Sequence, residues 1–232
     1  MNIAITGASK GIGYETAKLL GADSENTVIA ISRDKSRLEE LSDTGGAGTI
    51  IPIGFDLAMS RDSFENELKG HILEHIDRID ILINNAGHLI NKPFEEIKDD
   101  DMAKVFNVNL FGIVRISQLL IPFMGGSTRS HIINIGSMGG YQGSEKFAGL
   151  SVYSASKGAV ATLSECMALE LREKNIAVNC LALGAVQTDM LSKAFPGYEA
   201  PVQAVDMAKY IAEFALKGMH EFNGQVIPVE LI

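Results

Sequence analysis

A tyrosine and a lysine stand four residues apart in the segment Tyr153-Ser154-Ala155-Ser156-Lys157. On a helix, positions i and i+4 share a face, so these two side chains would project together. An unperturbed tyrosine has a pKa of about 10, which leaves about 4 kcal/mol against ionisation at neutral pH. A neighbouring ammonium favours the phenolate and should lower that pKa. The pair could therefore exchange a proton with a developing alkoxide.

A serine strengthens this interpretation, because the tyrosine–lysine spacing alone occurs by chance on many helices. Ser137 directly follows the apolar run that ends at Ile135-Gly136. In an open α/β sheet, ligands bind at the carboxyl ends of the strands, where this hydroxyl would lie. Ser137 could donate a hydrogen bond to a substrate oxygen as negative charge builds there.

A glycine-rich turn near the start of the chain joins the first apolar run to a helical pattern. Glycines at such a turn let the backbone approach a pyrophosphate, and the following helix offers free N–H groups with a positive dipole end. The segment therefore predicts a dinucleotide site at Gly7, Ser9, Lys10, Gly11, Ile12 and Gly13.

The residues after the second apolar run bear on which dinucleotide binds. An acidic residue there would bind the ribose hydroxyls of NAD, but this chain has Ser32 followed by Arg33. Lys10 and Arg33 would complement a 2′-phosphate. Asp34 is one residue too far along and better suits a helix cap. We expect NADP(H) rather than NAD(H); the alternative is that the two cations are ordinary surface residues.

Apolar runs alternate with helical segments along all 232 residues, without a repeat or linker. This alternation is typical of βαβ units and predicts one domain, a seven-stranded, doubly wound parallel α/β sheet over residues 1–232. The expected strands are Asn2–Thr6, Thr27–Ser32, Thr49–Ile53, Ile81–Asn84, His131–Ile135, Ala177–Leu181 and Gln225–Val229. The expected helices are Ile12–Leu20, Lys35–Leu41, Arg61–Ile76, Asp99–Met124, Val152–Lys174 and Ala204–Lys217.

Composition argues against several other classes of protein. The formal net charge of −9 disfavours nucleic-acid binding. No Cys/His cluster has zinc-ligand spacing, so we expect no metal, and His71 and His75 should lie on a solvated helix face. Cys166 and Cys180 are expected to be two buried thiols. Without a leader segment or an apolar stretch of about 18 residues, we expect a cytoplasmic protein that does not span a membrane.

The G-x-x-x-G-x-G turn and the Tyr-x-x-x-Lys pair together resemble the short-chain dehydrogenase/reductase family, and the resemblance covers nearly the whole chain. It implies a single-domain Rossmann-type fold with catalytic residues in the order Asn109, Ser137, Tyr153 and Lys157. Asn109 would support a water near the lysine; Asn107 lacks the right distance to Gly112. Lys157 would also hold the nicotinamide ribose and lower the tyrosine pKa.

The resemblance also implies further contacts with the cofactor. They involve Asp56, Leu57, Asn85, Ala86, Gly87, Tyr153, Lys157, Gly184, Val186 and Thr188, the last at the nicotinamide carboxamide. The chain departs from the family pattern at Leu183-Gly184, where Pro-Gly is usual, which puts the rigidity of that turn in doubt. His88 receives no role. The segment Met190–Val202 is expected to form a short substrate lid.

The expected activity is NADP(H)-dependent interconversion of a carbonyl and a secondary alcohol, with Tyr153 as general acid and base. One alternative is a 3-oxoacyl-thioester reductase of fatty-acid synthesis. Another, from a different class, is a non-catalytic NADP(H)-binding sensor. Only about 40 residues follow Thr188, too few for the substrate domain of an extended epimerase.

Two of the expected helices, residues 99–124 and 152–174, carry apolar residues around much of their circumference. One sheet-facing stripe would need fewer. We therefore expect these helices to be covered by a second subunit in a homodimer or homotetramer, although the domain could cover them itself.

Overall fold

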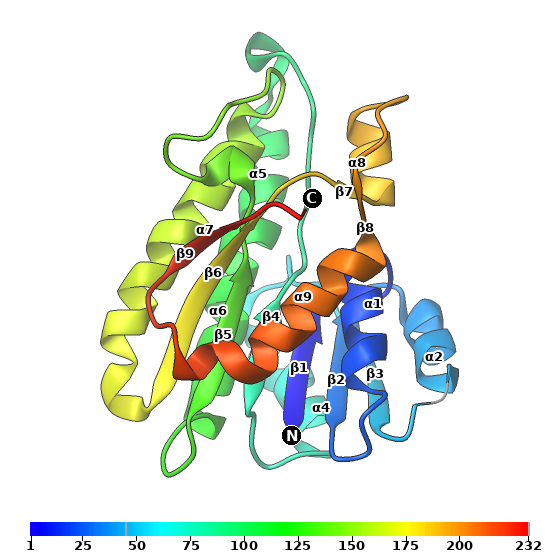
Figure 1. The fold of residues 1–232 in the computed structure, drawn as a ribbon, viewed down its shortest axis with the longest axis vertical. Helices are drawn as coiled ribbons and strands as arrows, with labels where there is room; N and C mark the ends of the chain where they lie inside the picture. The colour runs from blue at the N-terminus through cyan, green and yellow to red at the C-terminus, as the bar shows by residue number, and fades with distance from the viewer. Residues whose placement is uncertain (45, 232) are drawn as a thin grey trace.

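The β-branched and aliphatic runs of the sequence form the strands of one parallel sheet in the computed structural model, which describes residues 1–44 and 46–231. The strand order is β3-β2-β1-β4-β5-β6-β9, with every neighbouring pair parallel (Figure 1). All seven predicted strands are confirmed. Their bounds are β1 Asn2–Thr6, β2 Thr27–Ser32, β3 Thr49–Gly54, β4 Ile81–Asn84, β5 Ser130–Ile135, β6 Ile176–Leu183 and β9 Val226–Val229.

Helices cover both faces of this sheet and enclose two apolar cores. Figure 1 shows α1 and α9 crossing one face. That face is covered by α1 Gly11–Leu20, α2 Lys35–Asp43 and α9 Ala204–Lys217, and the other by α4 Lys69–Leu73, α6 Gly112–Leu120 and α7 Ser151–Glu170. Helix α5 Asp99–Phe106 packs against α7, and α3 Arg61–Ser63 precedes α4. The strands read as continuous apolar runs because helices bury both of their faces.

The two longest predicted helices before α7 are each interrupted by a π turn. Phe64–Leu68 separates α3 from α4, and Asn107–Phe111 separates α5 from α6. The first of these helical runs ends at Leu73, three residues before the predicted end. Such turns are often found at functional sites, because the added residue redirects the side chains around it.

The segment between β6 and α9 holds elements that the strand and helix patterns did not predict. The two-residue strands β7 Val186–Gln187 and β8 Val202–Gln203 pair in parallel, and α8 Asp189–Ala194 lies between them. Short 3-10 turns elsewhere cover Phe94–Glu96, Ile121–Phe123, Met138–Gly140, Arg172–Lys174 and Gly218–His220. The expected short lid therefore contains one helix of less than two turns.

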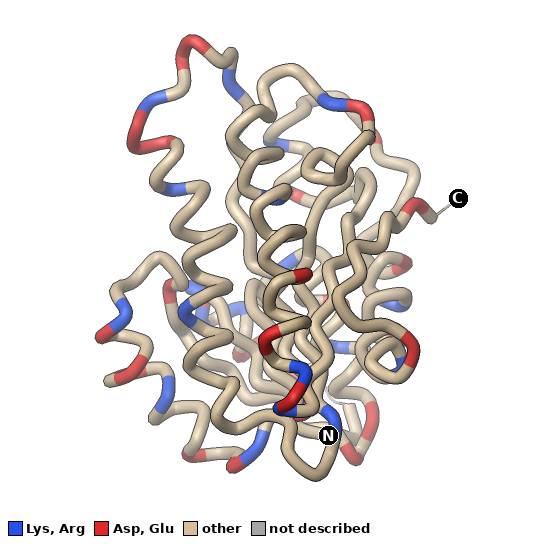
Figure 2. The backbone as a smooth tube through the Cα atoms, turned by 90° about the vertical axis from the view of Figure 1, so that its left-hand side faces the viewer, with Lys and Arg blue, Asp and Glu red and all other residues tan. Residues whose placement is uncertain are grey.

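One helical run, Asp99–Phe123, is long and apolar enough to cross a membrane by length and composition. The sequence did not predict a membrane-spanning helix here, because polar residues interrupt the run and no unbroken apolar stretch in it reaches about 18 residues. In the structure this run packs against the sheet and buries Val105, Ile116 and Leu120 in the core. Figure 2 shows Lys and Arg interspersed with Asp and Glu along the outer helices and loops.

Candidate active site

The glycine-rich turn leaves β1 and brings backbone close to the end of β4. Gly7 has φ +70°, and a Cβ there would lie 2.8 Å from Ala86 Cα. A Cβ on Gly13 would lie 2.3 Å from Asn85 Nδ2, which itself donates to the Thr6 and Gly7 carbonyls. Glycine is therefore required at both positions by close packing.

The first turn of α1 faces this bend with open backbone donors. The residue before the helix, Lys10, is extended, and its side chain does not cap the helix. The N–H groups of Gly11, Ile12 and Gly13 begin the helix and have no partner one turn earlier in it. This arrangement suits an anionic group.

Beside the turn, a cavity of about 560 Å³ is lined by four basic side chains, two acidic side chains and two serines. The Ser9 and Ser32 hydroxyls are 2.8 Å apart at this site. The charged lining residues are Lys10, Arg33, Arg37, Lys193, Asp34 and Asp189. Lys10 Nζ lies 3.7 Å from Asp189 Oδ2 on α8, so an exposed ion pair joins the turn to α8.

Asp34 caps the N-terminus of α2, as the sequence predicted. Its Oδ1 accepts hydrogen bonds from the Arg37 backbone N–H at 3.3 Å and from the Ser36 hydroxyl at 3.0 Å, at the start of α2. One of its carboxylate oxygens is therefore committed to the helix terminus, which leaves it less available to a ribose.

A larger cavity of about 960 Å³ runs along the carboxyl edge of the sheet. Most of the predicted site residues line it: Gly7, Ser9, Lys10, Gly11, Ile12, Ser32, Arg33, Asp56, Leu57, Asn85, Ala86, Gly87, Ser137, Tyr153, Lys157, Gly184, Val186 and Thr188. Two predicted residues do not line it. Gly13 packs beneath the turn, and Asn109 is fully buried behind the cavity wall.

Tyr153, Lys157 and Ser137 meet in this cavity, Tyr153 and Lys157 on successive turns of α7. Lys157 Nζ lies 6.0 Å from the Tyr153 ring centroid and donates to the Ile135 carbonyl at 2.6 Å. The ammonium is therefore anchored on β5, the strand that leads to Ser137. Ser137 Oγ accepts from the Gly139 N–H at 3.1 Å, which fixes the hydroxyl at the strand end.

The pKa of Tyr153 differs from the sequence expectation. Burial raises it, and a hydrogen bond with Ser137 opposes that rise without reversing it. Burial of the phenolate therefore outweighs any favourable effect of the Lys157 ammonium, and the net pKa of Tyr153 is raised and not lowered. Tyr153 is a protonated phenol at neutral pH.

The pKa of Lys157 moves in the opposite direction. Burial lowers it to about 8, while the neighbouring Cys180 thiol acts weakly to raise it. Only 3 % of the lysine is exposed. Desolvation disfavours the charged form of either residue, so it shifts the phenol and the ammonium toward neutrality.

Asn109 lies in the π turn between α5 and α6 and connects two parts of the site. Its Oδ1 accepts from the His88 backbone N–H at 2.7 Å, and its Nδ2 donates to the His88 carbonyl at 3.0 Å. Nδ2 also donates to Ser156 Oγ at 2.9 Å, and Ser156 in turn donates to the Tyr153 carbonyl at 2.7 Å. Both amide protons are thus taken, and a water could meet only the side-chain oxygen. Asn109 fixes the chain after β4 against α7.

Two residues have structural roles that the sequence did not predict: His88 lines the cavity, and Thr188 caps a helix. The His88 side chain lines the larger cavity, and its pKa is lowered by burial and then by Arg33. Only its position directly after the Asn-Asn-Ala-Gly segment could have signalled this. Thr188 lines the same cavity, but its hydroxyl also caps α8 by accepting from the Leu191 N–H at 3.3 Å.

The cysteines depart in part from expectation. Both are free thiols, and Cys180 is buried on β6. Cys166, however, lies exposed on α7, so the prediction of two buried thiols is wrong for it. The helical periodicity that predicts α7 does not by itself say which face meets the sheet. His71 and His75 are exposed, as predicted.

Comparisons with known proteins identify relatives across most of the chain. The family model described as short chain dehydrogenase matches residues 1–199. A 3-oxoacyl-[acyl-carrier-protein] reductase of Thermotoga maritima is 35% identical over 191 residues, covering 82% of this chain and 75% of its own. Carbonyl reductase family member 4 of Xenopus laevis is 33% identical over 193 residues, covering 82% of this chain and 77% of its own.

Solved structures share the fold. The 3-ketoacyl-(acyl-carrier-protein) reductase of Brucella melitensis, complexed with NADH, superposes with a TM-score of 0.85 at 24% identity, covering 98% of this chain and 96% of that chain. The L-sorbose reductase of Gluconobacter frateurii, complexed with NADPH and L-sorbose, gives 0.86 at 21% identity, covering 99% and 94%. The matched family model, the two reductase relatives and the shared fold agree: this chain belongs to the short-chain dehydrogenase/reductase family and is an oxidoreductase acting on CH–OH and carbonyl groups.

Proposed function

We propose that this protein is an NADP(H)-dependent reductase that interconverts a carbonyl compound and a secondary alcohol, with Tyr153 as general acid and base. One observation carries the proposal: Tyr153, Ser137 and Lys157 share a single cavity with the glycine-rich turn. Groups suited to a phosphate and groups suited to a reacting oxygen thus line one continuous space.

The residues present fit a nicotinamide dinucleotide. Gly7 and Gly13 leave backbone space that a Cβ would fill, and the N-terminus of α1 offers unpaired N–H groups to a pyrophosphate. The complexes of two structural neighbours, one with NADH and one with NADPH, support a nicotinamide cofactor. When bound, the reduced cofactor supplies a hydride to the carbonyl carbon.

The choice of NADP(H) over NAD(H) rests on the smaller cavity. Lys10, Arg33, Arg37 and Lys193 bring four positive charges to it, against two carboxylates. Asp34, the residue best placed to compete for a ribose, is hydrogen-bonded to the start of α2. A 2′-phosphate carries close to two negative charges and would draw Lys10 away from Asp189.

The catalytic residues would divide the remaining chemistry among them. Ser137 orients the carbonyl oxygen by donating a hydrogen bond. Tyr153 gives its proton to that oxygen as the C–O double bond becomes a single bond. The protonated Lys157 stabilises the resulting phenolate, and Asn109 holds the chain beside them in place.

Two substrate groups are compatible with the relatives, 3-oxoacyl thioesters and general carbonyl compounds. We favour the general reductase. An acyl-carrier partner would favour a basic docking surface, whereas this chain has a net charge of −9 with its cations interspersed among acidic residues (Figure 2).

We also propose that a second copy of the chain covers helices 99–124 and 152–174. Phe111 and Met102 on the first helix, and Leu169 on the second, are large apolar side chains exposed to solvent. Burial of such side chains against another subunit is favourable.

The proposed function is tested by following NADPH consumption with ketones, aldehydes, quinones and acyl thioesters, in parallel with NADH. We expect turnover of at least one carbonyl class with NADPH preferred. NADPH binding without reduction of any carbonyl compound would instead support the sensor. Preference for NADH would contradict the assignment of Lys10 and Arg33.

A further inference from the structure

We infer that the substrate half of the large cavity selects uncharged, largely apolar ketones, and that Glu145 and Glu230 at its rim disfavour anionic ones. The inference rests on the proposed function and adds the substrate class to it.

The strand order divides the cavity into two halves. The glycine-rich turn, Arg33 and Asp56 follow β1, β2 and β3, which form one side of the sheet. Ser137 and Gly184 follow β5 and β6 on the other side. Because parallel strands end at the same edge, a dinucleotide lying along that edge would bring its nicotinamide end to Gly184 and Thr188, and the substrate would lie beside that end, next to Ser137 and Tyr153.

The substrate half has apolar walls contributed by three separate segments. Met190 on α8 reaches the catalytic centre: its Cε, Lys157 Nζ and Asn109 Oδ1 all lie within 4 Å of the position of a Cβ on Gly87. Phe147 and Tyr198 are exposed at the rim. The apolar residues that line this half include Leu89, Phe147, Leu150, Met190, Phe195 and Tyr198. Such walls stabilise a ligand through burial of apolar surface.

Positive charge is placed elsewhere. Of the cations lining the large cavity within residues 1–44 and 46–231, Lys10 and Arg33 lie at the dinucleotide end and Lys157 belongs to the catalytic group. Lys146, in the loop before α7, donates to the Tyr141 carbonyl at 2.6 Å and to Ser144 Oγ at 2.8 Å. Its ammonium is held against its own loop, and Lys146 does not line the cavity.

Negative charge remains at the rim. Glu145 lines the cavity from the loop between Ser137 and Tyr153. Glu230 lines it from the end of β9, and its Cγ lies 3.4 Å from the position of a Cβ on Gly184. Neither carboxylate is in an ion pair within the part of the chain that the structure describes. An anionic substrate would therefore meet two uncompensated like charges.

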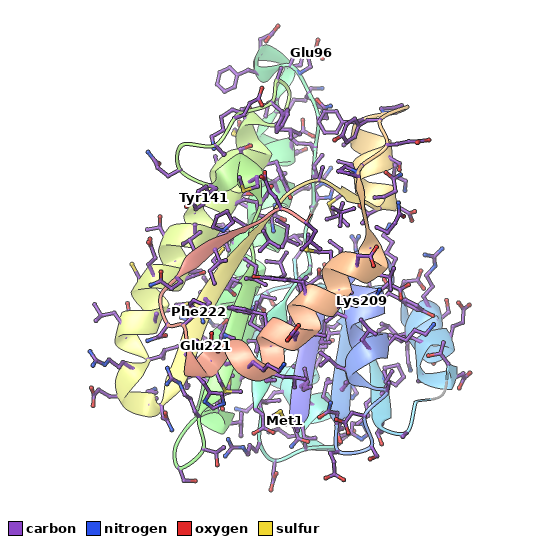
Figure 3. All side chains as sticks on the ribbon, in the orientation of Figure 1. Met1, Glu96, Tyr141, Lys209, Glu221 and Phe222 are labelled. Atoms are coloured by element: carbon purple, nitrogen blue, oxygen red, sulfur yellow. The ribbon has the colours of Figure 1, made fainter. Side chains whose placement is uncertain are left out.

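The test uses two ketones that differ in one charge, methyl 4-acetylbenzoate and 4-acetylbenzoate. The rate of reduction of each ketone by NADPH is measured for the wild type, for the double variant Glu145→Gln/Glu230→Gln and for the control Glu221→Gln. Figure 3 shows Glu221 near the end of α9, away from the carboxyl edge of the sheet. The control removes a surface carboxylate without changing the cavity lining.

We expect the wild type to prefer the ester at least tenfold in kcat/KM. The ester-to-carboxylate ratio should fall by about threefold for each carboxylate removed, and should fall in the wild type as salt is added. Comparing this ratio between variants cancels the different intrinsic reactivities of the two ketones. Glu221→Gln should leave the ratio within twofold of wild type.

A binding measurement separates failure of this inference from failure of the proposed function. Dissociation constants of both ketones are measured on the wild type saturated with NADP⁺. Tighter binding of the ester, with no turnover of any compound in the carbonyl panel, supports the inference and contradicts the proposed function. Turnover with equal kcat/KM for both ketones, or a ratio that the double variant leaves unchanged, overturns the inference alone. Binding of neither ketone also overturns it.

Discussion

The Lys157 ammonium lies 6.0 Å from the centre of the Tyr153 ring and donates a hydrogen bond to the Ile135 carbonyl. The ammonium is therefore held in place by strand β5 and not by the phenol. Burial raises the pKa of Tyr153 and lowers the pKa of Lys157 to about 8. Burial of Tyr153 therefore favours a neutral phenol, which is the form that a general acid needs for carbonyl reduction.

Arg33 should determine the preference for a phosphorylated cofactor. A charge-assisted hydrogen bond to a phosphate contributes about 1.5–3 kcal/mol, so Arg33→Ala should raise the Kd of NADPH by about 10- to 100-fold. The Kd of NADH should change by less than about threefold, because it lacks the phosphate. Titration of both nucleotides into both proteins measures this. An equal loss for the two nucleotides would contradict the phosphate site.

Lys157 should lower the stability of the fold at neutral pH. Its pKa is about 8 when folded and 10.5 in the reference state, so the unfolded chain binds more protons between these values. Unfolding free energy therefore rises with pH across that window, and the full cost, up to about 3 kcal/mol, applies below pH 8. Lys157→Met should be more stable than wild type at pH 7.

Urea unfolding at pH 7 and pH 10 tests this, with the difference between the two proteins as the readout. Cys180 has a pKa raised to about 11 by burial and acts in the opposite direction above pH 9. Because Lys157 itself lowers this thiol pKa, the wild type and Lys157→Met are compared in a Cys180→Ala background. The advantage of the variant should shrink toward pH 10, and an advantage that grows with pH would contradict a buried ammonium.

His131 should make the fold sensitive to acid. The ring is fully buried, with Nδ1 3.2 Å from the Ala215 carbonyl and Nε2 3.0 Å from Asn179 Nδ2, and burial lowers its pKa to about 4. The unfolded chain takes up this proton from about pH 6.5 downward, so stability is lost as the pH falls from 6.5 to 4.

His131→Gln provides the comparison, because glutamine does not titrate. Between pH 6.5 and 4 the wild type should lose up to about 3 kcal/mol more unfolding free energy than the variant, measured by urea unfolding at each pH. The variant is expected to be the less stable of the two at pH 7, since it loses ring contacts with Phe214. Parallel pH profiles would show that His131 does not titrate in this way.

Leu169 should lie in a subunit interface. It is 74 % exposed on α7. Leu169→Glu should therefore reduce the mass measured by light scattering to that of one chain, with an unchanged circular dichroism spectrum. Leu19→Glu is the control, since Leu19 is 36 % exposed on α1, outside the proposed interface. A monomeric wild type, or an oligomer that survives Leu169→Glu, would contradict this placement.

The sequence predicts the sheet and the glycine-rich turn well, because both depend on local patterns. A strand, a glycine bend and a helix occur in order around Gly7 and Gly13, and close packing leaves no space for a side chain at either. The i, i+4 spacing of Tyr153 and Lys157 likewise follows from helical geometry, and both side chains face one cavity.

Long-range packing and desolvation account for what the sequence did not predict. The π turn places Asn109 where it forms hydrogen bonds with His88 and Ser156, which are 21 and 47 residues away in the sequence. The direction of the Tyr153 pKa depends on burial that no local pattern reports. Helix α8 was missed because it is only six residues long and starts at a threonine cap, with too few turns for an apolar period.

Tyr153→Phe tests the central claim most directly, because it removes one hydroxyl and keeps the ring. We predict that kcat for carbonyl reduction falls by at least about 10³-fold, while the Kd of NADPH changes by less than about threefold. Turnover by the variant within tenfold of wild type would contradict Tyr153 as the proton donor.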